Sequence, residues 1–209
     1  MIKTENLKYR YKNASEDIVF PDINLSQGEQ TLIIGKSGCG KTTLLHLLAA
    51  LLKNQSGEIS LINTNVDKFF GAKLDKFRGE NIGIVFQTPY FIDSLNVEDN
   101  LLLVQKLSKF KKDKERILKV LEDVKLASKL KSRVFELSQG EKQRVTIARA
   151  IVNYPKLILA DEPTSSLDDE SCNNVINLLK KAAKKENATL VIVTHDNRLK
   201  EVFSNIIKL

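Results

Sequence analysis

TLIIGKSGCGKTT, at residues 31–43, is the stretch that decides the fold of this chain. The apolar run that opens it is short and β-branched and stops abruptly at Gly35, and a leucine-rich run starts at Thr42. Between them, residues 35–42 match the pattern GxxxxGK[ST] in the strand, loop and helix setting that the pattern requires. Backbone N–H groups in such a loop turn inward around phosphate groups, and the start of the following helix adds partial positive charge. The stretch therefore predicts a buried strand, a phosphate-binding loop and a buried helix over residues 42–52.

A second apolar run, LILA at residues 157–160, ends in two adjacent carboxylates, Asp161 and Glu162. In a phosphate loop of this type, Lys41 reaches the terminal phosphates of a nucleotide and the Thr42 hydroxyl is offered to Mg²⁺. Asp161 is then expected to belong to the Mg²⁺ shell, and Glu162, one residue farther out, to polarise a water molecule aligned with the γ-phosphate. Carboxylates at strand ends are common, so the combination with the phosphate loop is what predicts Mg²⁺-dependent nucleotide hydrolysis.

The apolar spacing outside these motifs predicts the rest of the fold. Strands are predicted at residues 2–11, 18–20, 58–62, 82–86, 190–193 and 205–209, with a turn at residues 12–17 and a helix at residues 170–185. Residues 96–149 have the spacing of helices, which indicates an inserted helical subdomain. Alternating strands and helices toward the end of the chain are typical of a parallel sheet. We therefore expect an α/β fold with a mostly parallel sheet, an N-terminal antiparallel β subdomain and an inserted α-helical subdomain.

Composition and charge bound the class of protein. The chain has 209 residues, is 42% hydrophobic and 28% charged, and has a formal net charge of +7, which fits one folded globular domain and excludes a disordered chain. Its longest apolar stretch, residues 44–52, is about half as long as a membrane-spanning helix. The chain begins without an apolar signal segment, and Cys39 and Cys172 have neither zinc-ligand nor disulfide-framework spacing, so we expect a cytoplasmic protein. The positive charge alone permits nucleic acid, an anionic membrane surface or nucleotide as partner, or simply a solvated surface.

LSQGE, at residues 137–141, opens another helical pattern. Ser138 and Glu141 have the S-x-x-E spacing of a capping box, in which each side chain bonds the backbone N–H of the other residue. A capping box explains Ser138 and Glu141 but not Gly140 between them. The pattern therefore indicates more than the start of a helix.

Taken with the phosphate loop and the acid pair, these residues resemble the nucleotide-binding subunit of ATP-binding-cassette (ABC) transporters. LSQGEKQR at residues 137–144 resembles the family signature, with Gln139 where the commoner form has glycine; Gln87 resembles the Q-loop glutamine, SSLD at residues 165–168 the D-loop, and His195 the switch histidine. The motifs occur in the family's order and span residues 11–195, nearly the whole chain. The resemblance implies a P-loop NTPase core within one domain, residues 1–209. Residues 1–87 and 153–209 form the core with the antiparallel β subdomain, and residues 88–152 form the helical subdomain.

The resemblance also implies a mechanism that uses ATP and Mg²⁺. The phosphate-loop residues expected to contact ATP are Gly35, Lys36, Ser37, Gly38, Cys39, Gly40, Lys41, Thr42 and Thr43. Thr42, Gln87 and Asp161 are expected to hold Mg²⁺, and Glu162, His195 and Gln87 to form the catalytic group. Two copies associate head to tail as a homodimer when ATP binds, so that Ser138 and Gly140 of one copy cap the γ-phosphate held by the other. We expect ATP hydrolysis in spite of Gln139.

Two aromatic residues are candidates for stacking on the adenine ring. By resemblance Tyr11 stacks on adenine, and Tyr9, on the same side of the predicted strand, is the alternative. His46, inside the leucine-rich helix, is interpreted as a packing or helix-surface residue. Cys39 lies in the phosphate loop near a helix amino terminus, which favours the reactive thiolate, so we expect its alkylation to block ATP binding. The alternative is that Cys39 is a small residue that the loop merely tolerates.

An ABC subunit without membrane spans works only through separate integral membrane transporter subunits, which implies a place on the inner face of the cell membrane. The apolar and aromatic residues among 88–95 are expected either to receive a coupling helix of those subunits or to pack in the core. Residues 136–168 resemble most closely the lipoprotein-releasing and macrolide-efflux ATPases and the related cell-division ATPase. We therefore expect an exporter or a lipoprotein-release system, with a non-transport regulator of the cell-division type or an importer ATPase as alternatives. No nucleic acid partner is expected, because DNA-repair ATPases of the superfamily interrupt the core with long coiled coils and this chain has no sustained heptads.

Overall fold

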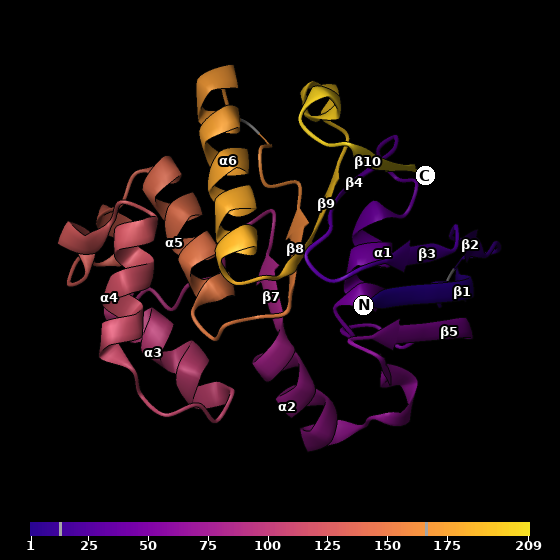
Figure 1. The fold of residues 1–209 in the computed structure, drawn as a ribbon, viewed down its shortest axis with the longest axis horizontal. Helices are drawn as coiled ribbons and strands as arrows, with labels where there is room; N and C mark the ends of the chain where they lie inside the picture. The colour runs from indigo at the N-terminus through magenta and orange to yellow at the C-terminus, as the bar shows by residue number, and fades with distance from the viewer. Residues whose placement is uncertain (13, 166) are drawn as a thin grey trace.

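The computed structural model describes residues 1–12, 14–165 and 167–209, which form two sheets and six α-helices (Figure 1). The strands are β1 (Ile2–Tyr9), β2 (Ile18–Val19), β3 (Ile23–Leu25), β4 (Gln30–Ile34), β5 (Ser56–Leu61), β6 (Thr64–Asn65), β7 (Ile82–Val85), β8 (Leu157–Asp161), β9 (Thr189–Thr194) and β10 (Asn205–Lys208). The helices are α1 (Lys41–Leu48), α2 (Gly71–Asn81), α3 (Val97–Leu107), α4 (Lys114–Asp123), α5 (Gln139–Ile151) and α6 (Asp169–Lys185). Short 3₁₀ turns lie at Val66–Lys68, Ala127–Lys129, Val134–Glu136 and Asn197–Glu201.

One sheet is parallel and runs through the middle of the molecule (Figure 1). Its strand order is β10-β4-β9-β8-β7, and each neighbouring pair is parallel. Ile34 pairs with Thr194 and Val85 with Ala160, so the strands β4, β9, β8 and β7 end at one edge of the sheet. Open α/β sheets bind their ligands at the carboxyl ends of the strands. The predicted parallel sheet is confirmed, and it places the phosphate loop after β4 and the acid pair after β8 at the same edge, with β9 between the two strands.

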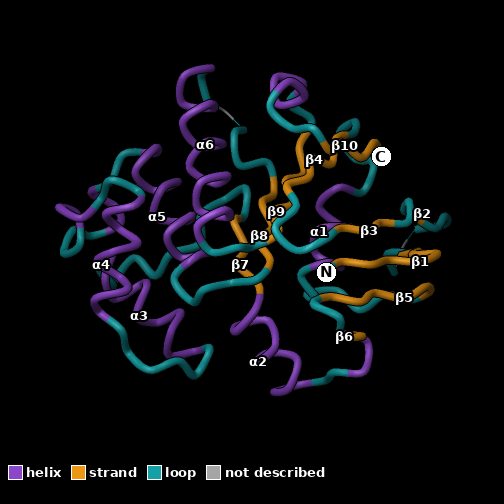
Figure 2. The backbone as a smooth tube through the Cα atoms, viewed as in Figure 1, coloured by secondary structure: helices purple, strands orange, loops and turns teal. Residues whose placement is uncertain are grey.

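Both faces of the parallel sheet are buried, as its continuous apolar runs require. Leu32 and Ile158 belong to a first hydrophobic cluster that includes residues of α3, α4, α5 and α6. Their neighbours Ile33 and Leu159 belong to a second cluster that includes α1 and the other sheet. Figure 2 shows this layering, with α4, α5 and α6 on one side of the parallel strands and α1, β1, β3 and β5 on the other. Because side chains alternate along a strand, one sheet supports two cores.

The second sheet is antiparallel and is built on β1, which pairs with β2, β3 and β5. Tyr9 pairs with Ile18, so the hairpin predicted at the start of the chain is confirmed. A bulge follows Glu5, and Asn6 in it has a positive φ of 51°. A Cβ on Gly57 would lie 2.4 Å from the carbonyl oxygen of Glu5. Glycine is therefore required opposite the bulge.

One helix prediction needs correction, and one helix of the structure is absent from the predictions. The helix expected over residues 42–52 ends at Leu48, because the chain turns at Ala50, which has a positive φ of 53°. Helix α2 lies outside every predicted element, because it contains no buried residue and so has no apolar stripe to reveal it. The strands β3 and β6 are three and two residues long, too short for an alternating pattern.

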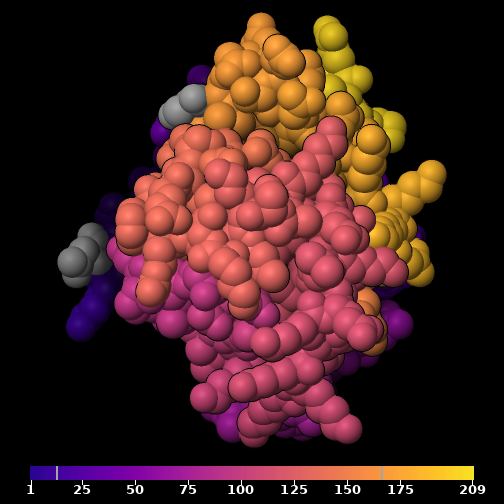
Figure 3. Space-filling model, turned by 90° about the vertical axis from the view of Figure 1, so that its left-hand side faces the viewer, coloured from indigo at the N-terminus to yellow at the C-terminus, as the bar shows by residue number. Residues whose placement is uncertain are grey.

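The helical run expected over residues 96–149 is divided into α3, α4 and α5. Each helix begins at a side chain that accepts a backbone N–H of the first turn: Asn96, Asp113 and Ser138. The three helices lie beyond β7, and their residues cover most of the face seen in Figure 3, with α6 above them. Within the described ranges, no helix combines the length and apolar character needed to cross a bilayer.

Gly83 in β7 lets α5 approach the parallel sheet closely. A Cβ on Gly83 would lie 2.0 Å from the carbonyl oxygen of Ala150 in α5. The backbone of β7 fixes the position of the Cβ, and the oxygen belongs to the backbone of α5, so the helix itself must move. We expect Gly83→Ala to lower the free energy of unfolding by about 3 kcal/mol. Urea denaturation measures the change. Gly140→Ala is the control, because a Cβ there meets only Arg144 at 3.7 Å and alanine favours a helix; equal effects of the two changes would contradict the packing argument.

Candidate active site

The phosphate loop leaves β4 at Gly35 and enters α1 at Lys41, as the sequence predicts. Gly40 caps the helix with a φ of 98°, and a Cβ there would lie 2.8 Å from the side chain of Ile18. Lys41 is buried, and its Nζ donates hydrogen bonds to the carbonyl oxygens of Gly35 and Lys36, both at 3.0 Å. The loop therefore surrounds an ammonium group at the start of a helix, an arrangement suited to phosphate.

Asp161 meets the phosphate loop where β8 ends. Thr42 Oγ1 donates a hydrogen bond to Asp161 Oδ1 at 3.2 Å. Asp161 is buried, and burial raises the pKa of its carboxyl group, an effect that the hydrogen bond from Thr42 partly offsets. Mg²⁺ takes oxygen ligands and uses one or two protein groups together with phosphate and water, so this pair fits it. A larger cluster is missing: the described residues contain no group of three or more His, Cys, Asp or Glu that could hold a metal.

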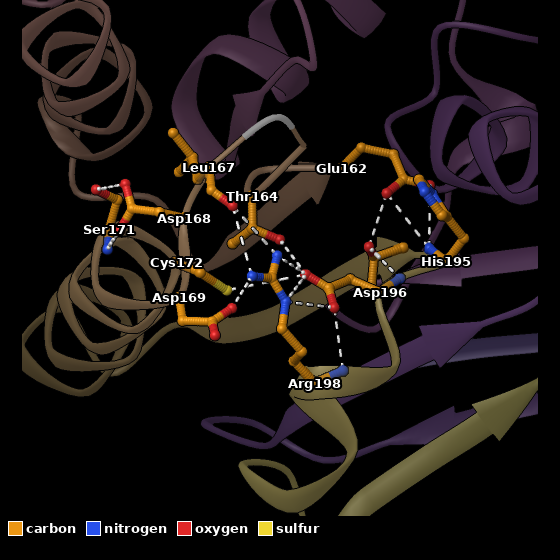
Figure 4. A network of polar contacts seen from close by, with 11 residues as sticks. Glu162, Thr164, Leu167, Asp168, Asp169, Ser171, Cys172, His195, Asp196 and Arg198 are labelled. Atoms are coloured by element: carbon orange, nitrogen blue, oxygen red, sulfur yellow. Dashed lines mark hydrogen bonds and ion pairs between the residues drawn. The ribbon is translucent and has the colours of Figure 1, made fainter.

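Glu162 and His195 face each other across the ends of β8 and β9 (Figure 4). Glu162 Oε1 accepts the backbone N–H of His195 at 3.1 Å and lies 2.8 Å from His195 Nδ1, and Oε2 accepts the Thr194 hydroxyl at 2.7 Å. Lys41 Nζ lies 3.6 Å from Glu162 Oε1. Glu162 is buried and has a φ of 45°, a strained backbone that is kept only where the surroundings hold it. Thr194 is not among the site residues predicted from the sequence. Its position directly before His195 is the feature that could have indicated it.

The two candidate adenine aromatics contact each other. The expectation that Tyr9 and Tyr11 share one strand face is wrong, because β1 ends at Tyr9 and the Arg10 N–H donates to the Gln55 side chain instead of a neighbouring strand. The two tyrosine rings meet edge to face at 5.0 Å, and Tyr9 packs against the second hydrophobic cluster. The Tyr11 hydroxyl lies 2.8 Å from Thr43 Oγ1, and Tyr11 is 46% exposed. Tyr11 therefore combines an open ring with a contact to the phosphate loop.

Gln87 follows β7 at the same edge of the sheet as Asp161, and its side chain is exposed. Among the hydrogen bonds of the described residues, none joins Gln87 to Thr42 or Asp161. The structure thus brings Thr42 and Asp161 together and leaves Gln87 outside the pair.

The signature residues lie on the helical segment. Ser138 caps α5 as predicted: its Oγ accepts the Glu141 N–H at 3.2 Å, and Glu141 accepts the Ser138 N–H at 2.8 Å. The second of these bonds holds the pKa of the Glu141 carboxyl below its usual value. A Cβ on Gly140 would contact only Arg144, at 3.7 Å. Within the part of the chain that the structure describes, no hydrogen bond joins Ser138 or Gly140 to the phosphate loop.

The stretch expected to form the D-loop precedes α6. Ser166 lies outside the described residues. Asp168 caps α6 by accepting the Ser171 N–H at 2.9 Å, and its bonds to Ser171 hold the pKa of the Asp168 carboxyl below its usual value. The carbonyl oxygen of Leu167 faces Arg198 (Figure 4).

Residues 21–165, which include the phosphate loop and the acid pair, match the family model of ABC transporters. The chain belongs to the ABC transporter family. This cassette is 38% identical over 190 residues to the lipoprotein-releasing system ATP-binding protein LolD of Legionella pneumophila (strain Lens), across 90% of its own length and 84% of that protein. It is also 38% identical to the LolD protein of Treponema denticola, across 95% of its own length and 90% of that protein.

Solved ABC cassettes have the same fold. The dimeric structure of MJ0796, a bacterial ABC transporter cassette, matches with a TM-score of 0.89 and 33% identity over 100% of this chain and 94% of that one. A second structure of MJ0796 is a dimer in a post-hydrolysis state bound to ADP and Pi, and it matches equally well. The predicted family, fold class and ATPase function are confirmed: the cassette is the ATP-binding and ATP-hydrolysing subunit of an ABC transporter.

Cys39 offers a chemical test of the phosphate loop of the cassette. Its side chain is half-buried, and Sγ packs closely against Gly35, where an added Cβ would lie only 2.6 Å away, so a group attached to Sγ crowds the phosphate loop. We expect treatment with N-ethylmaleimide to abolish binding of a fluorescent ATP analogue. Cys172 is buried, so Cys39→Ser is expected to bind ATP and to resist the reagent. Normal binding of the ATP analogue by protein that mass spectrometry shows to be alkylated at Cys39 would contradict this expectation.

Proposed function

We propose that the cassette is the ATP-driven motor of a membrane complex that acts on lipoproteins, and that it works as a homodimer formed on ATP binding. The observation that carries the proposal is the meeting of four groups at one edge of the parallel sheet. Lys41 Nζ lies 3.6 Å from Glu162, and Thr42 is hydrogen-bonded to Asp161. These are the groups that ATP hydrolysis needs to bind phosphate, to bind metal and to activate water.

In this proposal the phosphate loop binds the triphosphate through Gly35, Lys36, Ser37, Gly38, Cys39, Gly40, Lys41, Thr42 and Thr43. Tyr11 stacks on adenine, which its exposure and its contact with Thr43 support. Thr42 and Asp161, joined by Gln87 from the loop after β7, would hold Mg²⁺. When bound, Mg²⁺ neutralises charge that develops on the phosphate oxygens.

Glu162 takes the proton of the attacking water. Its carboxylate lies beside Lys41, which would hold the terminal phosphate, so that the water it activates lies close to the reacting atom. His195 keeps the carboxylate in place through two contacts, from its backbone N–H and from Nδ1. Catalysis then depends on the two loops that follow β8 and β9.

A second copy completes the site. Ser138 and Gly140 lie at the amino terminus of α5, where the partial positive charge of the helix favours the γ-phosphate of the partner. The signature residues have no hydrogen bond to the phosphate loop of their own copy in the described chain, which is what a shared site requires. The dimeric MJ0796 cassettes support this arrangement.

The membrane subunits dock on the Q-loop patch, which we define as Phe86, Tyr90 and Ile92. Tyr90 is 65% and Ile92 44% exposed, and the rings of Phe86 and Tyr90 meet edge to face at 5.6 Å. Phe91 instead packs against the first hydrophobic cluster. The two interpretations of residues 88–95 therefore apply to different side chains. A helix of a membrane subunit seated on the patch keeps the cassette on the inner face of the membrane.

The division of the cassette follows from the same proposal. Residues 88–152, which contain α3, α4 and α5, move as the helical subdomain, and residues 1–87 and 153–209 form the core with the antiparallel β subdomain. The Q-loop patch lies at the junction between these two parts. A membrane subunit docked there receives the movement of the helical subdomain.

The cargo assignment rests on the LolD relatives, whose name states that they belong to a lipoprotein-releasing system. A photo-crosslinker at Tyr90 identifies the membrane subunits, and one at Val19, which is also exposed, is the control. The cassette, these subunits and a fluorescent lipoprotein in proteoliposomes are then expected to release the lipoprotein when Mg²⁺ and ATP are added.

Each other outcome of this reconstitution points to one alternative. ATP turnover without movement of any cargo favours a regulator of the cell-division type, and uptake of a solute favours an importer. ATP binding without dimerisation or turnover, even with the membrane subunits present, would overturn the motor proposal in favour of nucleotide sensing.

A further inference from the structure

Arg198 is the centre of a polar network that the mechanism above leaves unused (Figure 4). It lies in the 3₁₀ turn that follows β9. Its Nε lies 2.9 and 3.0 Å from the two carboxylate oxygens of Asp196, and Nη2 donates to Asp196 at 2.7 Å. Nη2 also donates to the carbonyl oxygen of Leu167 at 3.4 Å, and Nη1 forms an ion pair with Asp169. One guanidinium thus binds both the segment before α6 and the residue that follows His195.

Asp196 connects this network to Glu162. The Asp196 N–H donates to Thr194 Oγ1 at 3.0 Å, and the Thr194 hydroxyl donates to Glu162 Oε2 at 2.7 Å. Thr164, two residues after Glu162, donates its hydroxyl to the Asp196 carboxylate at 3.3 Å. The loops after β8 and β9 are therefore joined twice at Asp196, and Arg198 holds the carboxylate at that junction.

The two acidic partners of Arg198 differ in burial. The Asp196 side chain is 14% exposed and the Asp169 side chain 84%. Water screens the exposed pair, so the contact with Asp196 is the stronger one. Arg198 also holds the pKa of the Asp196 carboxyl below its usual value, which keeps the pair ionised near neutral pH.

We propose that Arg198 is a positioning residue for ATP hydrolysis, which holds the loops of Glu162 and His195 against the segment before α6. This inference rests on the catalytic roles proposed above for these two residues. A displacement of about 1 Å in a catalytic group lowers a rate steeply, and the strained backbone of Glu162 stays in place only if its surroundings hold it. In the described chain, Arg198 has no hydrogen bond or ion pair with the phosphate loop. Its loss is therefore expected to slow turnover and to spare ATP binding.

The geometry of the network requires a guanidinium. Its N–H groups point outward in one plane, so Asp196 and the Leu167 carbonyl are bound at the same time. Arg198→Lys keeps the positive charge but offers a compact ammonium group, which cannot reproduce both contacts. Charge and geometry can therefore be separated experimentally.

Steady-state ATP hydrolysis by the full-length protein, together with its membrane subunits if they are needed for turnover, tests the inference. We expect Arg198→Met to lower kcat by about tenfold or more, with KM and the Kd of a fluorescent ATP analogue unchanged within about twofold. Arg198→Lys is expected to have an intermediate kcat. Asp169→Asn removes only the exposed pair. Arg78→Met removes a half-buried arginine of α2 that pairs with Asp75 and donates to the Ala50 carbonyl, contacts that lie outside the Arg198 network, so both controls are expected to keep the wild-type kcat.

A double variant separates positioning from folding. In a Glu162→Gln background, Arg198→Met is expected to cause no further loss of turnover, because the group that it positions is already disabled. An unchanged kcat in Arg198→Met, a parallel loss of ATP binding, or a further loss in the double variant would each overturn the inference. If Arg198→Met does not fold, Arg198→Lys tests the inference instead: its kcat must fall while its KM stays unchanged. Absence of hydrolysis by the wild-type protein would overturn the proposed function instead, so the two failures are distinguishable.

Discussion

Glu162→Gln is expected to bind ATP with wild-type affinity and to hydrolyse it about 10²- to 10⁴-fold more slowly. Glutamine keeps the shape of the side chain and an oxygen that can accept the His195 N–H, but it cannot take a proton from water. Lys41 and Thr42 are unchanged, so ATP still binds. Phosphate release measures kcat. Light scattering after gel filtration measures the ATP dimer, which is expected to be long-lived because hydrolysis no longer reopens it.

Glu58→Gln is the matched control for this variant. Glu58 is an exposed glutamate of β5, and its loss is expected to change neither kcat nor dimerisation. Wild-type turnover by Glu162→Gln would show that another group activates the water. Loss of ATP binding together with turnover would show that Glu162 supports the site rather than the chemistry.

Arg116→Ala is expected to lower the free energy of unfolding by about 3–5 kcal/mol. Arg116 in α4 is 4% exposed and donates from Nη2 to Glu186 Oε1 at 2.8 Å and to the Ile151 carbonyl at 2.6 Å. Its guanidinium also lies 3.9 Å from the ring centre of Tyr154. Alanine leaves a buried carboxylate without its counter-charge and a buried carbonyl without its donor, and both losses favour the unfolded chain. Urea denaturation measures the difference.

Replacement of both partners tests the reason for that loss. Arg116→Met combined with Glu186→Leu removes the charges together, and we expect most of the lost stability to return, because well-packed apolar residues can replace a buried ion pair. Arg10→Ala removes an exposed pair with Asp17 and is expected to change stability by about 1 kcal/mol or less. If Arg116→Ala were no more destabilised than Arg10→Ala, the buried pair would not hold α4 against the rest of the molecule.

The sequence predicts the strands and helices that have strong periodicity and misses those that do not. The apolar runs of β4, β8 and β9 identify a parallel sheet, because strands buried on both faces have near-continuous apolar runs instead of alternating apolar and polar residues. Helix α2 has no buried residue, so no pattern reveals it. The caps at Asn96 and Asp113 mark where two helices begin in a stretch whose periodicity predicts helices but not their boundaries. Local propensity therefore finds the elements of the core better than those of the surface.

The candidate site divides in the same way. The phosphate loop and the acid pair are short motifs, and the sequence places Lys41, Thr42, Asp161 and Glu162 correctly at the ends of their elements. The contact between Tyr11 and Thr43 depends on where β1 ends, and the assumption of a continuous strand fails there. The network of Arg198 has no motif at all, because its partners come from two loops and a helix start.

By itself, the sequence determined the family, the phosphate loop, the acidic strand end and the alternation of strands and helices, since each of these depends on residues close together in the chain. Only the tertiary structure decided which distant residues meet. Glu162 contacts His195 and Thr194, and Arg116 pairs with Glu186. Gly83 lets α5 pack closely against β7. These contacts join residues far apart in the sequence. They form only when whole elements pack, and packing is set by the shapes of all the side chains between them rather than by any local pattern.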